Sequence, residues 1–284
     1  AHEICNRYGI DTISTGATVA FAMECFEKGL LSPEDVGGLQ LNFGNAPAMV
    51  ELVEKIARRQ GFGDILARGS KKAAEIIGRN SIDYAMQIKG LEIPFHEPRL
   101  NQGLSIHYSI HAIGADHVSG LIDNVLVGQL DNWDRIDQAE ELPPTELSSR
   151  KTRMEYELGL YRGLFNYLGI CAFMPWNITD LRAAVEAVAG WPVTSWKLIN
   201  AVKRGITLMR IFNLREGFSH KDDRLPGRFH SARSEGPLKG VKIDPDDHRK
   251  ARVLYYQMMG WSAEGVPTNA CLAALDIEWA AKYM

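Results

Sequence analysis

Residues 5–29 read CNRYGIDTISTGATVAFAMECFEKG, and this stretch decides the fold class. From Ser14 to Glu27 its apolar residues recur at helical spacing, and Gly29 ends the run. Its opening pattern, Asn-x-x-Gly-Ile at 6–10, returns at 166–170 after another helical run. Glycine followed by an apolar residue is typical of a helix C-terminus, where Gly adopts the left-handed conformation and the next side chain packs back. The stretch therefore predicts helices that end in tight glycine turns.

Similar signals extend this prediction over most of the chain. We expect further helices at 46–59, 64–77, 146–168, 179–189, 194–216, 244–259 and 270–283, and a short one starting at Ser32–Asp35. Residues 86–89 alternate as a short strand would, and 90–120 are rich in Gly, Pro and His without a long helical period. Residues 131–144 are polar, so we expect them to be exposed. The predicted fold class is mainly α and multihelical, with few or no strands, and a domain boundary between 1–86 and 87–284.

Composition narrows the function classes. The 284 residues carry 32 Lys+Arg against 35 Asp+Glu, a net charge of −3, and 45% are hydrophobic. These values are those of an ordinary globular protein and exclude a disordered chain. No basic block suggests a nucleic-acid or membrane surface, and no apolar run approaches the ~20 residues of a membrane span. We therefore expect neither nucleic acid nor membrane as a partner.

The cysteines are few and scattered. Cys5, Cys25, Cys171 and Cys271 form no C-x-x-C pair, which excludes a self-contained zinc ribbon, a redox dithiol and a disulfide framework. Such usage fits a reducing cytoplasm. Taken singly, each cysteine is most simply a small buried apolar residue.

The repeated Asn-x-x-Gly-Ile pattern has two interpretations. The simpler one is a pair of helix caps. The other uses the same geometry, because a helix end presents carbonyl groups and an Asn or Asp side chain in a fixed place. Two such ends facing each other could bind the hydrogen-bonding edges of two similar heterocycles.

Further motifs follow in a fixed order. They are Thr12–Gly16, Lys89–Pro94, Gly114–His117, Arg210–Gly217, Leu225–Phe229 and Tyr255–Trp261. Together with the repeated pattern they resemble the tungsten-containing aldehyde:ferredoxin oxidoreductase family, and the resemblance covers nearly the whole chain. It implies the C-terminal portion of that family, namely part of its helical second domain and its third domain. A chain that begins at Ala1, without an initiator Met, fits the expectation that an N-terminal half is missing.

The resemblance assigns cofactor roles residue by residue. In the family, two pterin dithiolenes hold one tungsten, and the matching positions here are Asn6, Ile10 and Asp11 for one pterin and Asn166 and Ile170 for the other. The family has Asp where this chain has Asn6 and Asn166, which removes a charge from each contact. Cys171 matches the fourth ligand of a 4Fe–4S cluster, whose other three cysteines lie upstream in the family. We therefore expect neither cofactor to be bound to this chain alone.

The resemblance also implies the catalytic and substrate residues. His117 matches a histidine near the tungsten that the family uses for proton transfer or to bind the substrate oxygen, and an imidazole that titrates near neutrality suits such work. Its alternative is a loop histidine satisfied by backbone. His107, Tyr108 and His111 are expected in the substrate pocket, where the stretch from His107 to Ile113 departs from the family.

The implied function is oxidation of an aldehyde to a carboxylate, with electrons passing through the cluster to ferredoxin or another electron-transfer subunit in the cytoplasm. The metal would be tungsten or molybdenum. One alternative is an aromatic acyl-CoA reductase-type subunit of the same family, and another is a helical scaffold without cofactor, which the two Asn residues favour weakly. We expect this chain alone to be inactive and to need its N-terminal half. It should also expose apolar surface and self-associate, and a homodimer is a further expectation.

Overall fold

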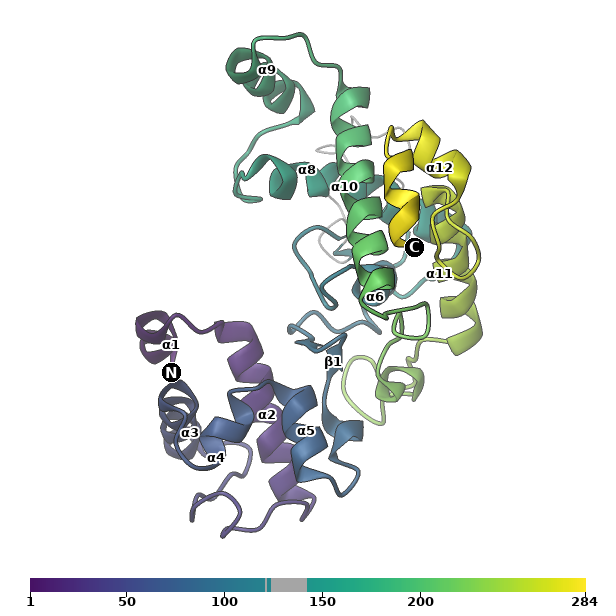
Figure 1. Ribbon diagram of the computed structural model, residues 1–284. Helices are drawn as coiled ribbons and strands as arrows, with labels where there is room; N and C mark the ends of the chain where they lie inside the picture. The colour runs from purple at the N-terminus through teal and green to yellow at the C-terminus, as the bar shows by residue number, and fades with distance from the viewer. Residues whose placement is uncertain (121, 124–141) are drawn as a thin grey trace. The chain divides into compact units, whose positions relative to one another are not determined.

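A computed structural model describes residues 1–120, 122–123 and 142–284. Among these residues, one two-stranded sheet accompanies a set of helices, so the mainly α prediction is confirmed (Figure 1). The α-helices are α1 (His2–Tyr8), α2 (Thr12–Glu27), α3 (Ala46–Arg58), α4 (Phe62–Leu66), α5 (Ser70–Ile77), α6 (Gln102–Ile110), α8 (Ser149–Leu168), α9 (Ile178–Ala189), α10 (Ser195–Arg215), α11 (Pro245–Met259) and α12 (Asn269–Ala274). The 3-10 helices are η1 (Ser81–Tyr84), η3 (Gly227–His230) and η4 (Glu278–Tyr283). The strands β1 (Gln87–Ile88) and β2 (Leu91–Glu92) are antiparallel, with Gln87 opposite Glu92.

The chain divides into two compact units. The first contains 1–95, 113–115 and 225–231, and the second contains 96–112, 116–224 and 232–284. The boundary at residue 87 refers to the domains of the family and stays a prediction. None of the described helices combines the length and apolar character that a membrane span requires.

Helix α2 is the central element of the first unit. It packs against α1, α3, α4 and α5, and its buried Val19, Phe21 and Ala22 share a core with Leu52 and Val53 of α3. The Asp11 carboxylate caps its N-terminus by accepting a hydrogen bond of 2.9 Å from the Ser14 N–H. The core and the cap together explain why the quoted stretch is helical.

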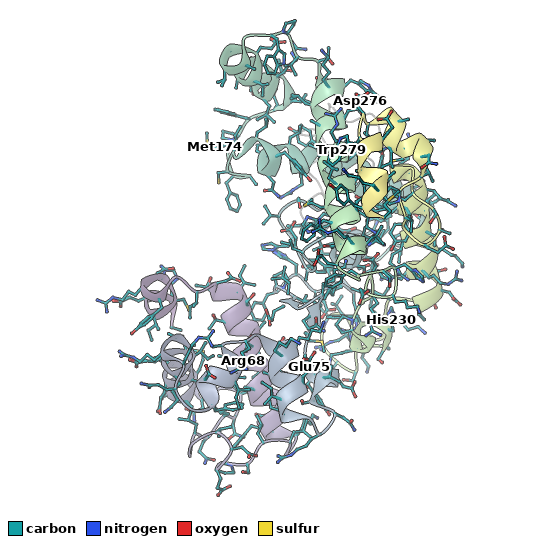
Figure 2. All side chains as sticks on the ribbon, viewed as in Figure 1. Arg68, Glu75, Met174, His230, Asp276 and Trp279 are labelled. Carbon is teal, nitrogen blue, oxygen red and sulfur yellow. The ribbon has the colours of Figure 1, made fainter. Side chains whose placement is uncertain are left out.

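Helices α6, α8, α10 and α11 form the core of the second unit. Leu160 and Leu164 of α8 pack with Val202 of α10 and Met259 of α11. Helices α8 and α10 approach closely at Gly163, where a Cβ would lie 2.7 Å from Val202 Cγ1. The loop from α8 to α9 carries the exposed Met174, and η4 carries the exposed Trp279 (Figure 2).

Four sequence predictions are wrong in detail. Ser32–Asp35 begins a turn and no helix, because left-handed Gly37 and Gly38 follow at once. The predicted helix 64–77 is two helices, α4 and α5, separated at Gly69, whose φ is 82°. The predicted helix 270–283 is α12 and η4, interrupted at Asp276 with a φ of 55°. The irregular segment 90–120 contains α6. Most of 131–144 lies outside the described residues.

Candidate functional site

Helix α6 carries the site and is anchored by a buried ion pair. Its first residues donate backbone hydrogen bonds to the Asp123 carboxylate, Gly103 N–H at 3.1 Å and Leu104 N–H at 3.1 Å. The Lys151 ammonium on α8 lies 2.7 Å from Asp123 Oδ1, and both side chains are at most 1% exposed. Burial raises the pKa of the Asp123 carboxyl, and the Lys151 charge opposes this shift. The pair therefore fixes where α6 begins.

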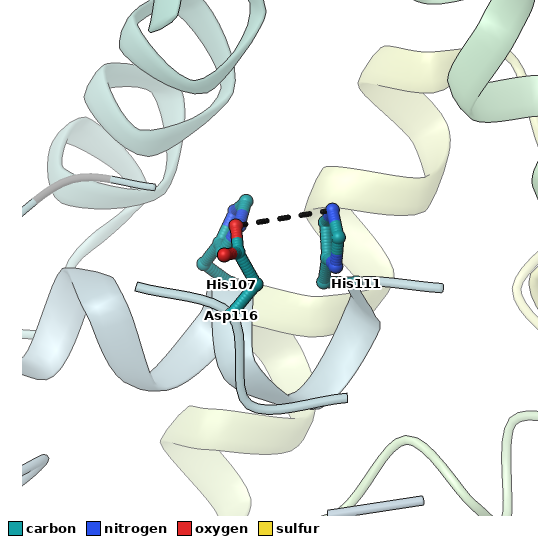
Figure 3. Close-up of side chains that lie close together, drawn as sticks. All are labelled: His107, His111 and Asp116. Atoms are coloured by element: carbon teal, nitrogen blue, oxygen red, sulfur yellow. Dashed lines mark hydrogen bonds and ion pairs between the residues drawn. The ribbon is translucent and has the colours of Figure 1, made fainter. Parts of the chain in front are cut away.

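His107 on α6 lies between two carboxylates. Its Nδ1 is 2.9 Å from Glu155 Oε1 on α8, and its Nε2 is 3.4 Å from Asp116 Oδ2. One helical turn later, the His111 ring stacks on the His107 ring with centroids 4.9 Å apart. Its Nε2 is 4.0 Å from Asp116 Oδ2 (Figure 3). Four ionisable side chains thus meet in one buried cluster, which we call the His107 cluster: His107, His111, Asp116 and Glu155.

A tight turn fixes the Asp116 carboxylate. It accepts hydrogen bonds from the Val118 N–H at 3.2 Å, from the Ser119 N–H at 3.0 Å and from the Ser119 hydroxyl. The next residue, Gly120, touches the histidine directly, because a Cβ there would lie 2.5 Å from His107 Cγ. Glycine at 120 therefore lets the turn approach the imidazole.

The two carboxylates stabilise positive charge on His107. Burial alone would lower the pKa of His107, but the hydrogen bonds and charges of Asp116 and Glu155 raise it to about 9. Burial alone would likewise raise the pKa of the Asp116 carboxyl, but the His107 hydrogen bond and charge hold it well below its usual range. Arg162 on α8 is a second cation near these carboxylates, and burial lowers its pKa. The raised pKa favours the imidazolium form of His107 at neutral pH.

A cavity of about 270 Å³ adjoins this cluster. His107, His111 and Ser119 line one part of it, and Asn166 and Tyr167 from the end of α8 line another. Most of the remaining lining is apolar, including side chains of α10 and α11. A cavity of this kind suits a largely apolar molecule with a few polar atoms at fixed positions.

The repeated pattern forms two helix caps of the same geometry. Gly9 ends α1 with φ 66° and ψ 34°, and Gly169 ends α8 with φ 68° and ψ 28°. In each cap the following Ile donates a backbone hydrogen bond to the helix, Ile10 to Cys5 at 3.0 Å and Ile170 to Phe165 at 2.8 Å. The helix-cap interpretation is confirmed at both places. Whether the two ends also bind pterins stays a prediction.

The side chains of these caps differ in their present contacts. The Asn6 amide lies 3.0 Å from the His2 ring, and Asp11 caps α2. Asn166 is exposed on the wall of the cavity, whereas Ile10 and Ile170 pack against the cores of their own units.

The remaining predicted residues lie at different depths. His117 is partly buried and packs its ring against His96, with centroids 5.1 Å apart, and it does not line the described cavity. Tyr108 is fully buried, donates its hydroxyl to the His96 carbonyl at 3.4 Å, and does not line the cavity either. Cys171 is exposed, whereas Cys5, Cys25 and Cys271 are buried.

Sequence reasoning missed two members of the cluster. The motif Gly114–His117 contains Asp116 but gives it no role, and Glu155 is one of several charged residues in the helix predicted over 146–168. The four-residue spacing of His107 and His111, together with a nearby acid, was the available signal for Asp116. Nothing in the sequence pairs Glu155 with His107, because α6 and α8 meet only in the folded protein.

Comparisons with known proteins agree over most of the chain. A sequence model of the family described as aldehyde ferredoxin oxidoreductase, domains 2 & 3, matches residues 1–277. The tungsten-containing aldehyde ferredoxin oxidoreductase of Pyrococcus furiosus is 33% identical over 98% of this chain and 44% of its own length. That of Thermococcus kodakarensis is 32% identical over 93% and 42%. An aliphatic sulfonate oxidoreductase, WOR-like subunit, of Pyrococcus furiosus is 28% identical over 96% and 41%.

A solved structure shares the fold. The active site complex BamBC of benzoyl coenzyme A reductase in complex with 1,5 dienoyl-CoA matches with a TM-score of 0.73 and 24% identity, covering 98% of this chain and 46% of that one. The chain thus spans about half the length of the curated relatives it matches. Because the model of domains 2 & 3 matches residues 1–277, the chain belongs to the aldehyde ferredoxin oxidoreductase family.

Proposed function

We propose that the chain is the C-terminal part of a pterin-dependent tungsten or molybdenum enzyme that oxidises an aldehyde to a carboxylate. The observation that carries this proposal is the matched pair of helix ends at Gly9 and Gly169, found in a chain of this family. The tungsten named in the relatives supports the choice of metal.

The residues at these helix ends fit a pterin. Asn6 and Asn166 are exposed amides, each offering one acceptor and two donors to the edge of a heterocycle. When bound, the pterin-held metal supplies the two-electron chemistry. The chain's own part is to hold the two pterins through Asn6, Ile10, Asp11, Asn166 and Ile170.

His117 and Cys171 have separate roles in this proposal. His117 transfers a proton at an imidazole nitrogen, and its ring is partly buried beside His96. Cys171 offers an exposed thiol in the loop after Gly169, where it can serve as one ligand of a 4Fe–4S cluster. The three further thiolates would come from the rest of the protein, and ferredoxin or another electron-transfer subunit would accept the electrons.

A second candidate is reduction of an aromatic acyl thioester. It is favoured by the two histidines that line a mostly apolar cavity and by the fold shared with benzoyl coenzyme A reductase. The two candidates differ in the direction of electron flow and in the substrate that the cavity receives.

Full-length protein prepared without oxygen separates these functions. Elemental analysis should find one tungsten or molybdenum and about four iron atoms per chain. A protein that contains no tungsten, no molybdenum and no iron would support the scaffold alternative instead. Aldehyde-dependent reduction of ferredoxin supports the first candidate, and turnover of an aromatic acyl-CoA without aldehyde activity supports the second. His117→Gln should lower kcat and keep the metals, with His230→Gln as a control.

A further inference from the structure

The His107 cluster has the composition of a mononuclear metal site. One ligand atom from each of His107, His111 and Asp116 lies within 4.8 Å of the others (Figure 3). We propose that these three side chains bind a divalent transition metal of the zinc or ferrous-iron class, separate from any pterin-held metal. The proposal rests on the geometry of the cluster and does not require the proposed function.

The hydrogen bond between His107 and Asp116 is long, and its length also suits two ligands of one ion. His107 Nε2 and Asp116 Oδ2 are 3.4 Å apart, and His111 Nε2 and Asp116 Oδ2 are 4.0 Å apart. A good N–H···O hydrogen bond spans about 2.7–3.2 Å. Two ligand atoms at about 2.0–2.1 Å from a tetrahedral zinc lie roughly 3.3–3.4 Å from each other. A tetrahedral site requires the His111 nitrogen to move about 0.6–0.7 Å closer to Asp116 Oδ2.

Helix α6 presents the two imidazoles together. The His111 N–H donates to the His107 carbonyl at 2.9 Å, so the second histidine continues the helical turn of the first. Residues four apart on a helix lie on the same face. Both rings lie beside the Asp116 turn and are stacked, so binding one ion requires the His111 ring to rotate until the two lone pairs converge.

Glu155 positions His107 for coordination. A metal-binding histidine usually donates its second ring N–H to a carboxylate or carbonyl, which fixes the tautomer and orients the ring. Here Glu155 Oε1 lies 2.9 Å from Nδ1 and thereby places the lone pair of Nε2 toward Asp116. Ser119 orients the Asp116 carboxylate through its N–H and its hydroxyl.

The charge and ligand types select the ion. The Asp116 and Glu155 side chains are 12% and 0% exposed, and a bound metal ion would replace the His107 proton as the positive charge beside them. Two imidazoles and one carboxylate suit zinc or ferrous iron, whereas calcium and magnesium prefer oxygen ligands. Three protein ligands leave the fourth coordination position of the metal open. Because both histidines line the cavity, a water or a substrate atom in that position would face the cavity.

Zinc is the probe for this site. The purified protein, stripped with EDTA and given one equivalent of zinc, should retain it, and zinc-edge X-ray absorption should show only N/O ligands, including imidazoles. This edge is selective for zinc, so tungsten or iron elsewhere does not contribute. His111→Gln should abolish retention, and Glu155→Gln should weaken zinc affinity about 10–100-fold. His220→Gln, in a loop of the same unit, is the matched control and should bind as the unchanged protein does.

Two results would overturn the proposal. Zinc–sulfur scattering near ~2.3 Å would place the ion on a cysteine. Equal zinc affinity in the His111→Gln variant would indicate an adventitious ion only. Circular dichroism checks that each variant is folded. The His111 side chain is the most exposed of the cluster at 16%, so its replacement disturbs the packing least.

Discussion

The Nδ1 atom of His107 lies 2.9 Å from Oε1 of Glu155, and the glutamate side chain is 0% exposed. Asp116 approaches the other ring nitrogen, so the metal-free imidazolium is held between two carboxylates. The arrangement links the protonation of one histidine to the packing of α6 against α8.

The first prediction concerns pH. Because the folded pKa of His107 is about 9, above the ~6.5 of an unfolded histidine, the folded protein binds the proton more tightly. The contribution to stability is complete below pH ~6.5 and is lost as the pH rises through about 9. Urea midpoints of the metal-free protein should therefore fall over this interval. His107→Gln should flatten the profile, and an equal fall in both proteins would contradict the assignment.

The second prediction concerns the anchor of α6. Lys151→Met leaves the Asp123 carboxylate buried without its ammonium partner, and breaking a buried pair typically costs about 3–5 kcal/mol. Lys250→Met removes a pair of similar length, 2.9 Å from Asp247, whose side chains are 67% and 51% exposed. We expect that change to leave the urea midpoint nearly unchanged, because water screens an exposed ion pair. Urea unfolding measures both, and similar losses would show that Lys151 does not anchor the helix.

The third prediction applies the same substitution to two helices of the first unit. Gly16 lies within α2 with no atom inside 4 Å of an added Cβ, so Gly16→Ala should stabilise the protein by about 0.5–1 kcal/mol. A Cβ at Gly63 in α4 would lie 2.3 Å from the Lys55 carbonyl carbon. Gly63→Ala should therefore destabilise by about 1–3 kcal/mol. Thermal unfolding gives both signs, and stabilisation by Gly63→Ala would contradict the close approach of α3 and α4.

The fourth prediction concerns thiol reactivity. Cys171 is exposed, whereas burial raises the pKa of Cys25 to about 12 and also raises the pKa of Cys271. Brief treatment of the folded protein with N-ethylmaleimide should label Cys171 well before Cys5, Cys25 and Cys271. Peptide mass spectrometry locates the label, and denatured protein should react at all four. Early labelling of Cys25 would show that its helix opens readily.

Local signals in the sequence predict much of this fold. The helical spacing of the apolar residues in α2 and the Gly-Ile caps at 9–10 and 169–170 each involve residues close together in the chain. The sequence alone therefore indicates them. Breaks at Gly69 and Asp276 were missed, since one left-handed residue interrupts a helix without erasing the apolar pattern around it. The resemblance predicts His107 and His111 as residues of a substrate pocket, but it does not predict their contacts with Asp116 or Glu155. Glu155 approaches through tertiary packing, which no spacing along the chain reveals.

All nine residues of α6 are buried, including the polar Gln102, Ser105 and Ser109. A saturation-mutagenesis map of the protein should therefore show an unbroken block of intolerance from Gln102 to Ile110. Helix α3 should instead alternate between tolerant and intolerant positions, since Glu51 and Glu54 face solvent whereas Leu52 and Val53 are buried. The segment hardest to recognise by its periodicity is thus the one that should vary least under selection.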